Sequence, residues 1–138
     1  MNIAVYDASG LITGRLSLAR SEDAKLYANY IEISAAQMTM PIEITHRVNP
    51  VSRIIEEKIP ITVTIDKPQI AADGLDEAAV TFLGLTGPVT ARVGNQRVLV
   101  TPLDNVIRIT SNAVVDLPVS IENDPVHFLS GGAIVRAK

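Results

Sequence analysis

Val89-Thr-Ala-Arg-Val-Gly-Asn-Gln-Arg-Val-Leu-Val-Thr101 is the stretch that decides the fold of this chain. Its apolar residues at positions 89, 91 and 93 alternate with Thr90 and Arg92, which is the pattern of a strand with one buried face. Gly94 and Asn95 interrupt the alternation, and glycine at the first corner suits a primed hairpin turn that matches the twist of the flanking strands. The stretch therefore predicts a β-hairpin with strands at 89–93 and 97–101.

The same alternation recurs on both sides of this hairpin. Apolar positions 61, 63 and 65 alternate with Thr62, Thr64 and Asp66, and positions 78, 80 and 82 repeat the pattern. Further short strands are expected at 106–110, 118–122 and 133–137. Seven short strands, separated by turns rich in Gly, Pro, Asp and Asn and with no helical period between them, are typical of a β-sandwich. We expect a mainly β chain in which residues 60–138 form an antiparallel sandwich of immunoglobulin-like type.

Residues 1–59 are expected to combine a hairpin, a short helix and extended strands. The Asp7-Ala-Ser-Gly10 turn predicts a β-hairpin over 2–17, and Ser21 followed by two acidic residues predicts a short helix over 21–28 capped by that serine. Strand alternation returns at 30–33 and over 38–45, where Pro41 indicates an edge strand or an extended arm. Asn49-Pro50 predicts a second hairpin turn. We interpret 1–59 as an attachment or interaction region and place the domain boundary at Pro60.

Composition excludes several classes of function. The net charge is −3 and the basic residues are spread along the chain rather than clustered, so we expect no nucleic-acid partner. The chain has no cysteine, which excludes disulfides and thiolate metal sites. No apolar run approaches the roughly 18 residues that a membrane span needs, and the start shows no recognisable secretion signal.

No motif for catalysis or cofactor binding is present. Neither His46 nor His127 lies in a zinc-binding HExxH arrangement, and each is more typical of a surface residue. The GxSxG elbow, the phosphate-binding loop and the dinucleotide fingerprint are all absent. A pair of carboxylates from distant strands stays open as a hydrolase site, but the sequence singles out no such pair. We predict a non-enzymatic protein with no catalytic residue and no cofactor.

The densest acidic site is Asp73-Gly-Leu-Asp76-Glu77. Clustered carboxylates on a turn are suited to calcium, which makes Asp73, Asp76 and Glu77 weak candidates for a metal site. The spacing lacks the alternating ligands of an EF-hand loop, and a solvated Asp-Gly turn explains the cluster equally well.

Five large apolar side chains are candidates for contact with a partner protein: Tyr6, Tyr30, Met38, Met40 and Phe128. Ordinary packing in a core is the alternative use of these side chains. Phe82 is not among the candidates because it alternates with core positions. The shortage of spare aromatic rings also weighs against a sugar site built on stacking.

Two stretches, Ala72-Asp-Gly-Leu-Asp-Glu-Ala78 and Gly84-Leu-Thr-Gly-Pro-Val-Thr-Ala-Arg-Val93, resemble the opening of bacterial Ig-like domains of adhesins and bacteriophage virion proteins. Residues 61–70 and 119–125 are similar to the same domains. The Tyr6-Asp-x-x-Gly10 hairpin followed by a short helix resembles the start of small phage tail-associated proteins. The resemblance covers most of the chain, which departs from it at 34–40 and 54–60.

The resemblance implies a structural protein of a phage virion, located in the tail, tail tip or fibre and synthesised in the host cytoplasm. Its partners would be other virion proteins or further copies of itself, and its exposed loops would contact another virion protein or a host surface. The alternative is an adhesin-like module that binds a cell-surface glycan through sandwich loops 72–77 and 123–132. An enzyme is the third alternative.

Overall fold

The computed structural model describes residues 1–138. They divide into two compact units, Met1–Lys58 and Ile59–Lys138. The division falls one residue before the boundary expected between residues 59 and 60. Each unit has its own hydrophobic core, made of residues from that unit alone.

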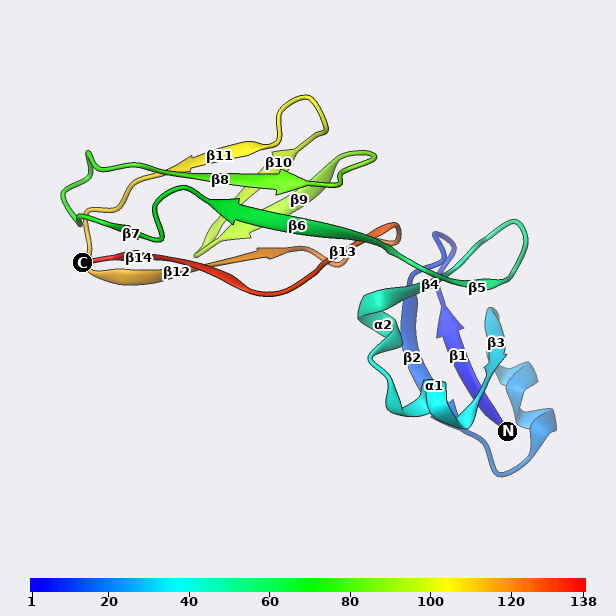
Figure 1. Ribbon diagram of the computed structural model, residues 1–138. Coiled ribbons are helices and arrows are strands. Elements are labelled where there is room, and N and C mark those ends of the chain that lie inside the picture. The colour runs from blue at the N-terminus through cyan, green and yellow to red at the C-terminus, as the bar shows by residue number, and fades with distance from the viewer. The chain divides into compact units, whose positions relative to one another are not determined.

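Residues 59–138 form two sheets (Figure 1). The five-stranded sheet has the order β10-β9-β12-β14-β7, and the four-stranded sheet has the order β11-β8-β6-β13. The strands of the four-stranded sheet are β6 (Ile59–Ile65), β8 (Ala78–Leu83), β11 (Val106–Ile109) and β13 (His127–Leu129). Those of the five-stranded sheet are β7 (Gln69–Ile70), β9 (Val89–Val93), β10 (Gln96–Val100), β12 (Val115–Ile121) and β14 (Ala133–Ala137).

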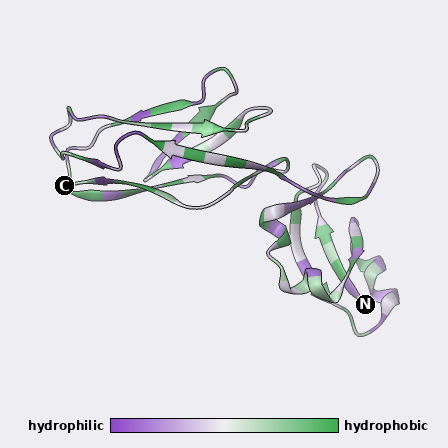
Figure 2. Cartoon of the chain, viewed as in Figure 1, coloured by the Kyte–Doolittle hydropathy of each residue, from purple (hydrophilic) through white to green (hydrophobic).

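One aliphatic core lies between these two sheets. Ile61, Val80 and Phe82 project into it from the four-stranded sheet, and Ala91 and Val135 project into it from the other. Figure 2 shows hydrophobic and hydrophilic residues alternating along β6, as expected for a strand with one buried face. Phe82 is 1% exposed, as its alternation predicted. The shared core confirms the predicted β-sandwich. The immunoglobulin-like type of the sandwich stays a prediction.

The Gly94-Asn95 turn has the expected geometry. Val93 pairs with Gln96 across it, which leaves a two-residue loop between β9 and β10. Gly94 has φ of +57°, and Asn95 has no positive φ. Positive φ at the first corner alone is the pattern of a type II′ turn, in which glycine is favoured.

All seven predicted strands of this unit are present, together with two that the sequence did not indicate. These are β7 and β13, which have only two and three residues. Both pair in parallel, β7 with β14 and β13 with β6. Strands this short carry too little alternation to be recognised.

Residues 1–58 combine a three-stranded antiparallel sheet of order β2-β1-β3, a separate hairpin and three short helical segments. The strands are β1 (Asn2–Tyr6), β2 (Ile12–Ser17) and β3 (Tyr30–Ile33), with β4 (His46–Val48) and β5 (Ile55–Glu57) in the hairpin. The helical segments are η1 (Ser21–Leu26), α1 (Ala35–Thr39) and α2 (Ile42–Thr45). The predicted hairpins over 2–17 and around Asn49 are confirmed.

The carboxylate of Asp7 closes the first hairpin turn. Its Oδ1 atom accepts hydrogen bonds from the Ser9 hydroxyl at 2.6 Å and from the amides of Ser9 and Leu11 at 2.9 and 3.1 Å. The Ser9 hydroxyl, and then the amides of this turn, hold the pKa of the Asp7 carboxyl below its usual value. The sequence motif is therefore explained by turn chemistry within this chain.

The predicted strand over 38–45 is wrong, because this segment contains α1 and α2. Ser34 caps α1 by accepting the Gln37 amide at 3.1 Å, and the Gln37 side chain accepts the Ser34 amide at 2.8 Å. This reciprocal pair is a capping box, which satisfies two free donors at a helix start. Pro41, read as a strand edge, instead stands immediately before α2.

The helix expected at 21–28 forms as a 3-10 segment over Ser21–Leu26. The predicted capping by Ser21 is wrong: Arg20 occupies the cap position, and no side chain bonds to the free amides there. Arg20 instead pairs with Asp23 at 3.0 Å.

No helix in the structure combines the length and the apolar character that crossing a membrane would require.

Candidate functional site

The acidic turn at Asp73–Glu77 is organised by its own carboxylates. Oδ1 of Asp73 accepts the amides of Leu75 and Asp76 at 2.8 and 2.9 Å. These amides, that of Asp76 first, hold the pKa of the Asp73 carboxyl below its usual value. Gly74 has φ of +75°, and its amide donates to the Ser111 carbonyl at 3.0 Å.

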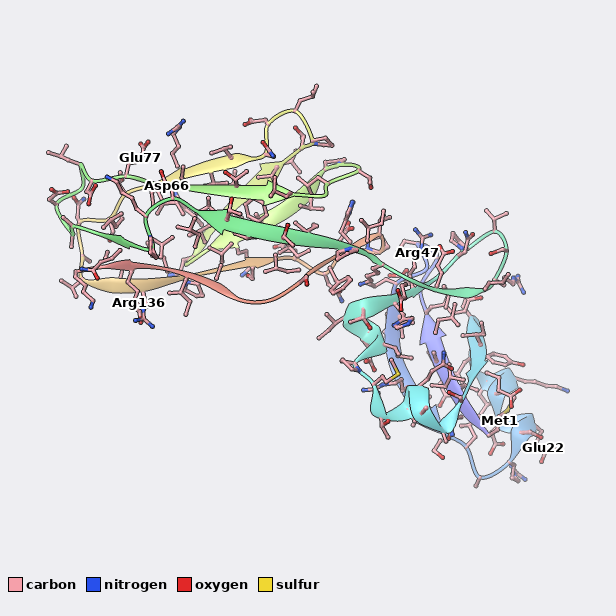
Figure 3. The ribbon with its side chains drawn as sticks, in the orientation of Figure 1. Met1, Glu22, Arg47, Asp66, Glu77 and Arg136 are labelled. Atoms are coloured by element: carbon pink, nitrogen blue, oxygen red, sulfur yellow. The ribbon has the colours of Figure 1, made fainter.

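The other two carboxylates of the turn bond to different partners. Asp76 accepts the Ala71 amide at 2.8 Å and the Lys67 ammonium at 3.0 Å, and these bonds lower the pKa of Asp76. Glu77, whose side chain points away from the ribbon in Figure 3, pairs with Arg108 at 3.1 Å. Nowhere does the structure gather three His, Cys, Asp or Glu side chains as a metal ion would require. The arrangement favours the solvated Asp-Gly turn over a calcium site.

The five interaction candidates lie in different environments. Tyr6 is 8% exposed and belongs to the core of residues 1–58, and Met38 is half-buried against that core. Tyr30 on β3 and Met40, which follows α1, are exposed. Phe128 is half-buried on β13, in the other unit. Of the five, Tyr30 and Met40 are therefore the most available to a partner.

Sequence reasoning missed an apolar surface beside strand β11. Leu83, Leu103 and Val106 are exposed to solvent by 45%, 101% and 37%. Val106 lies opposite Thr81 of β8, so Leu83, two residues further along β8, is its diagonal neighbour on the same face. Leu103 lies in the turn before β11, where the amides of Thr101 and Asp104 each bond the other's carbonyl. We call these three residues the edge patch.

The backbone next to the edge patch has unused hydrogen-bonding groups. Strand β11 ends its sheet and pairs only with β8. The Phe82 amide donates to the Asn105 carbonyl at 2.9 Å. Because hydrogen-bonded and non-hydrogen-bonded pairs alternate in an antiparallel ladder, the amides and carbonyls of Val106 and Arg108 point away from β8. An exposed edge of this kind is a template for a further strand.

Residues Thr86, Asp124 and His127 form a hydrogen-bonded chain in the sandwich. Nδ1 of His127 lies 2.8 Å from Oδ2 of Asp124, and Nε2 lies 2.8 Å from the hydroxyl of Thr86. The backbone amide of Thr86 also donates to Nε2, at 3.1 Å. His127 is 3% exposed, so its interpretation as a surface residue is wrong.

The bonds around His127 indicate which nitrogen of the neutral ring carries the proton. A backbone amide can only donate, so Nε2 must be the acceptor and carries no proton. The proton of the neutral ring is therefore on Nδ1, which donates to Asp124. The same carboxylate oxygen also accepts the amides of Val126 and His127, at 3.1 and 2.7 Å.

A hydroxyl, an imidazole and a carboxylate in this order are the groups of a nucleophilic triad. In this chain the base is already occupied, because the single lone pair of Nε2 is shared between the amide and the hydroxyl of Thr86. The ring is also buried, whereas a catalytic imidazole must reach the leaving group of a substrate. The geometry is that of a structural link between the β8–β9 loop and β13.

The second histidine has a local partner. Nδ1 of His46 lies 2.7 Å from the hydroxyl of Thr45, and the ring is half-buried. His46 belongs to residues 1–58 and His127 to residues 59–138.

No protein-family model, curated protein or solved structure matches this chain.

Proposed function

We propose that this chain is a non-enzymatic structural protein that acts through contacts with other proteins, and that it belongs to a phage virion as a tail, tail-tip or fibre component. The observation that carries the contact role is the edge patch beside β11. Three exposed aliphatic side chains adjoin a strand whose outer amides and carbonyls point away from its own sheet. Such a surface gives a partner both apolar area and backbone hydrogen bonds.

The strand order supports an immunoglobulin-like type for the sandwich. In that fold, strands A, B and E share one sheet and strands C, F and G share the other. Strands β6, β8 and β11 correspond to A, B and E, and strands β9, β12 and β14 correspond to C, F and G. The place in a virion rests on the resemblance of residues 61–70, 72–78, 84–93 and 119–125 to Ig-like domains of phage proteins.

The non-enzymatic part of the proposal rests on how the reactive groups are used. The imidazole of His127 is committed to Thr86 and Asp124, and the carboxylates of the acidic turn are committed to amides, Lys67 and Arg108. These imidazole and carboxylate groups are bonded to other groups of the chain and hold its loops in place, which supports a structural role for them.

The virion part is tested on the particles made by a strain that encodes the chain. Particles are purified by density-gradient sedimentation, and the chain is quantified by mass spectrometry. We expect it at a fixed ratio to the major tail protein through successive gradients. Complete removal of the chain from intact particles would contradict a place in the mature virion.

The contact part is tested in the same particles with two variants. Val106→Lys places a charge in the edge patch, and Leu75→Lys places one in the acidic turn, at a residue that is 85% exposed. We expect the first variant to be lost from particles and the second to be retained. Equal retention of both would exclude the edge patch as the contact surface.

A further inference from the structure

The two nitrogens of the His127 ring respond differently to a proton. Nδ1 donates to Asp124 in the neutral ring and continues to donate when the ring is charged. Nε2 accepts two hydrogen bonds from Thr86 in the neutral ring, through the amide and the hydroxyl. A protonated Nε2 is a donor and cannot accept either of them.

We propose that His127 is an acid-sensitive clamp, and that a proton taken up from solvent at Nε2 releases the β8–β9 loop from β13. The Thr86 amide and the new N–H group then face each other as two donors. The hydroxyl can rotate to accept a bond, but the amide cannot, so the loop must move away from the ring. Nδ1 continues to donate to Asp124 when Nε2 takes up a proton, so the bond on that side of the ring is kept.

The surroundings of the ring contain few competing charges. Strand β6, which pairs with β13, has no titratable side chain between Ile59 and Ile65, and the loop from Gly84 to Pro88 has none. The buried Lys58, which precedes Ile59, donates to the Glu43 carbonyl at 3.3 Å. Strand β12 also packs on β13. It carries Asp116, which lies 4.0 Å from Arg136, and it is followed by Glu122, which pairs with Arg92 and Arg97. Asp124 is the acid that contacts the ring.

The released segment is confined to the loop. Leu85, within the loop, packs on the core of the sandwich. The strands that flank the loop are held in sheets, β8 in the four-stranded sheet and β9 in the five-stranded sheet. The change is therefore a local movement of residues 84–88 and not an unfolding of the unit. This inference does not depend on the proposed virion role.

Nuclear magnetic resonance of the full chain, labelled with nitrogen-15, tests the clamp between about pH 8 and about pH 5, where histidine changes charge. We expect the ring nitrogens of His127 to report the Nδ1–H tautomer at the upper end. On acidification, the amide shift of Thr86 should change with the same midpoint as the His127 ring. The protection factor of that amide should fall roughly tenfold, as expected for the loss of about one hydrogen bond.

His46 is the internal control, because its titration should leave the Thr86 amide unchanged. A second test uses Asp124→Asn, which keeps an acceptor for Nδ1–H, so the Thr86 amide should still change together with the His127 ring. The clamp is refuted if His127 titrates while the Thr86 amide keeps its shift and protection. It is equally refuted if the ring of the wild-type protein stays neutral over the whole range.

Discussion

Replacing Arg15 with alanine removes a guanidinium that links β2 to the two short helices of residues 1–58. Its Nε atom donates to Glu43 at 2.6 Å, and its Nη1 atom donates to the Met38 carbonyl at 2.6 Å and also to the carbonyls of Gln37 and Met40. The Arg15 side chain is 24% exposed. The guanidinium therefore bonds the Met38 carbonyl at the end of α1 and is a second donor to the carbonyls of Gln37 and Met40, which also accept the amides of Met40 and Ile42.

The magnitude follows from these bonds. A hydrogen bond to a charged group contributes roughly 1.5–3 kcal/mol, and water can replace part of this at a half-buried site. We expect Arg15→Ala to lower the free energy of unfolding of this unit by about 2 kcal/mol. For a domain of this size, that corresponds to a fall of roughly 8–16 °C in the unfolding midpoint.

Tyrosine fluorescence is the assay. The chain has no tryptophan, and its three tyrosines, Tyr6, Tyr27 and Tyr30, all lie in residues 1–58. The signal from the full chain therefore reports on this unit alone. Arg20→Ala is the matched control, because Arg20 is 68% exposed and forms surface ion pairs, which contribute about 0–1 kcal/mol. Equal midpoints for the two variants would refute the proposed role of Arg15.

Three further predictions concern the turns and the triad-like chain. The folded pKa of Asp7 lies below its unfolded value, so the stability that Asp7 contributes is present above pH of about 3.8 and is lost as pH falls through the folded pKa. Asp7→Asn should flatten this acid dependence in urea titrations followed by tyrosine fluorescence, and an unchanged dependence would contradict the role of the Asp7 carboxylate. Gly94→Ala should destabilise the sandwich by about 1 kcal/mol, because alanine is strained at positive φ and its Cβ would lie 2.8 Å from Cδ2 of Leu117. Gly87→Ala should be nearly neutral, because a Cβ there meets nothing within 4 Å. Circular dichroism melts that show equal effects would be inconsistent with the assigned turn. A fluorophosphonate probe should leave Thr86 unlabelled, as mass spectrometry of the treated protein can check, and stoichiometric labelling that depends on His127 would establish a reactive nucleophile instead.

The sandwich could be predicted because its strands and turns are marked by residues that are close together in the sequence. Alternation in 89–93 marks the buried face of that strand, and Gly94 supplies the turn that leads into the strand predicted at 97–101. The same holds for β6 and β8, in which the alternating buried residues begin at Ile61 and Ala78. Pairing partners far along the chain were not needed to recognise these strands.

Alternation misled where short helices carry the same spacing. Met38, Met40, Ile42 and Ile44 alternate as in a strand, yet only Ile42 of these four is fully buried. The Ser34–Gln37 capping box was a local signal that could have identified α1. The contacts from Arg15 were not readable, because the partners lie 22 to 28 residues further along the chain.

The candidate site was less accessible to sequence reasoning than the fold. Thr86 and His127 are 41 residues apart, and nothing in either segment indicates that they meet. The edge patch also escaped notice, since Val106 and Leu83 become neighbours only through the pairing of β11 with β8. Conversely, the acidic turn was conspicuous in sequence, but its carboxylates bond within the chain.

Hydrogen–deuterium exchange on assembled particles tests the central claim most directly. Exchange of the peptide that spans Val106 to Arg108 is compared between the free full-length chain and the chain within purified particles. The proposed contact predicts that these outward-facing amides become protected on assembly, while the peptide that spans Asp73 to Glu77 is unchanged. Unaltered exchange at Val106 and Arg108, in particles that contain the chain, would contradict a role for this edge in assembly.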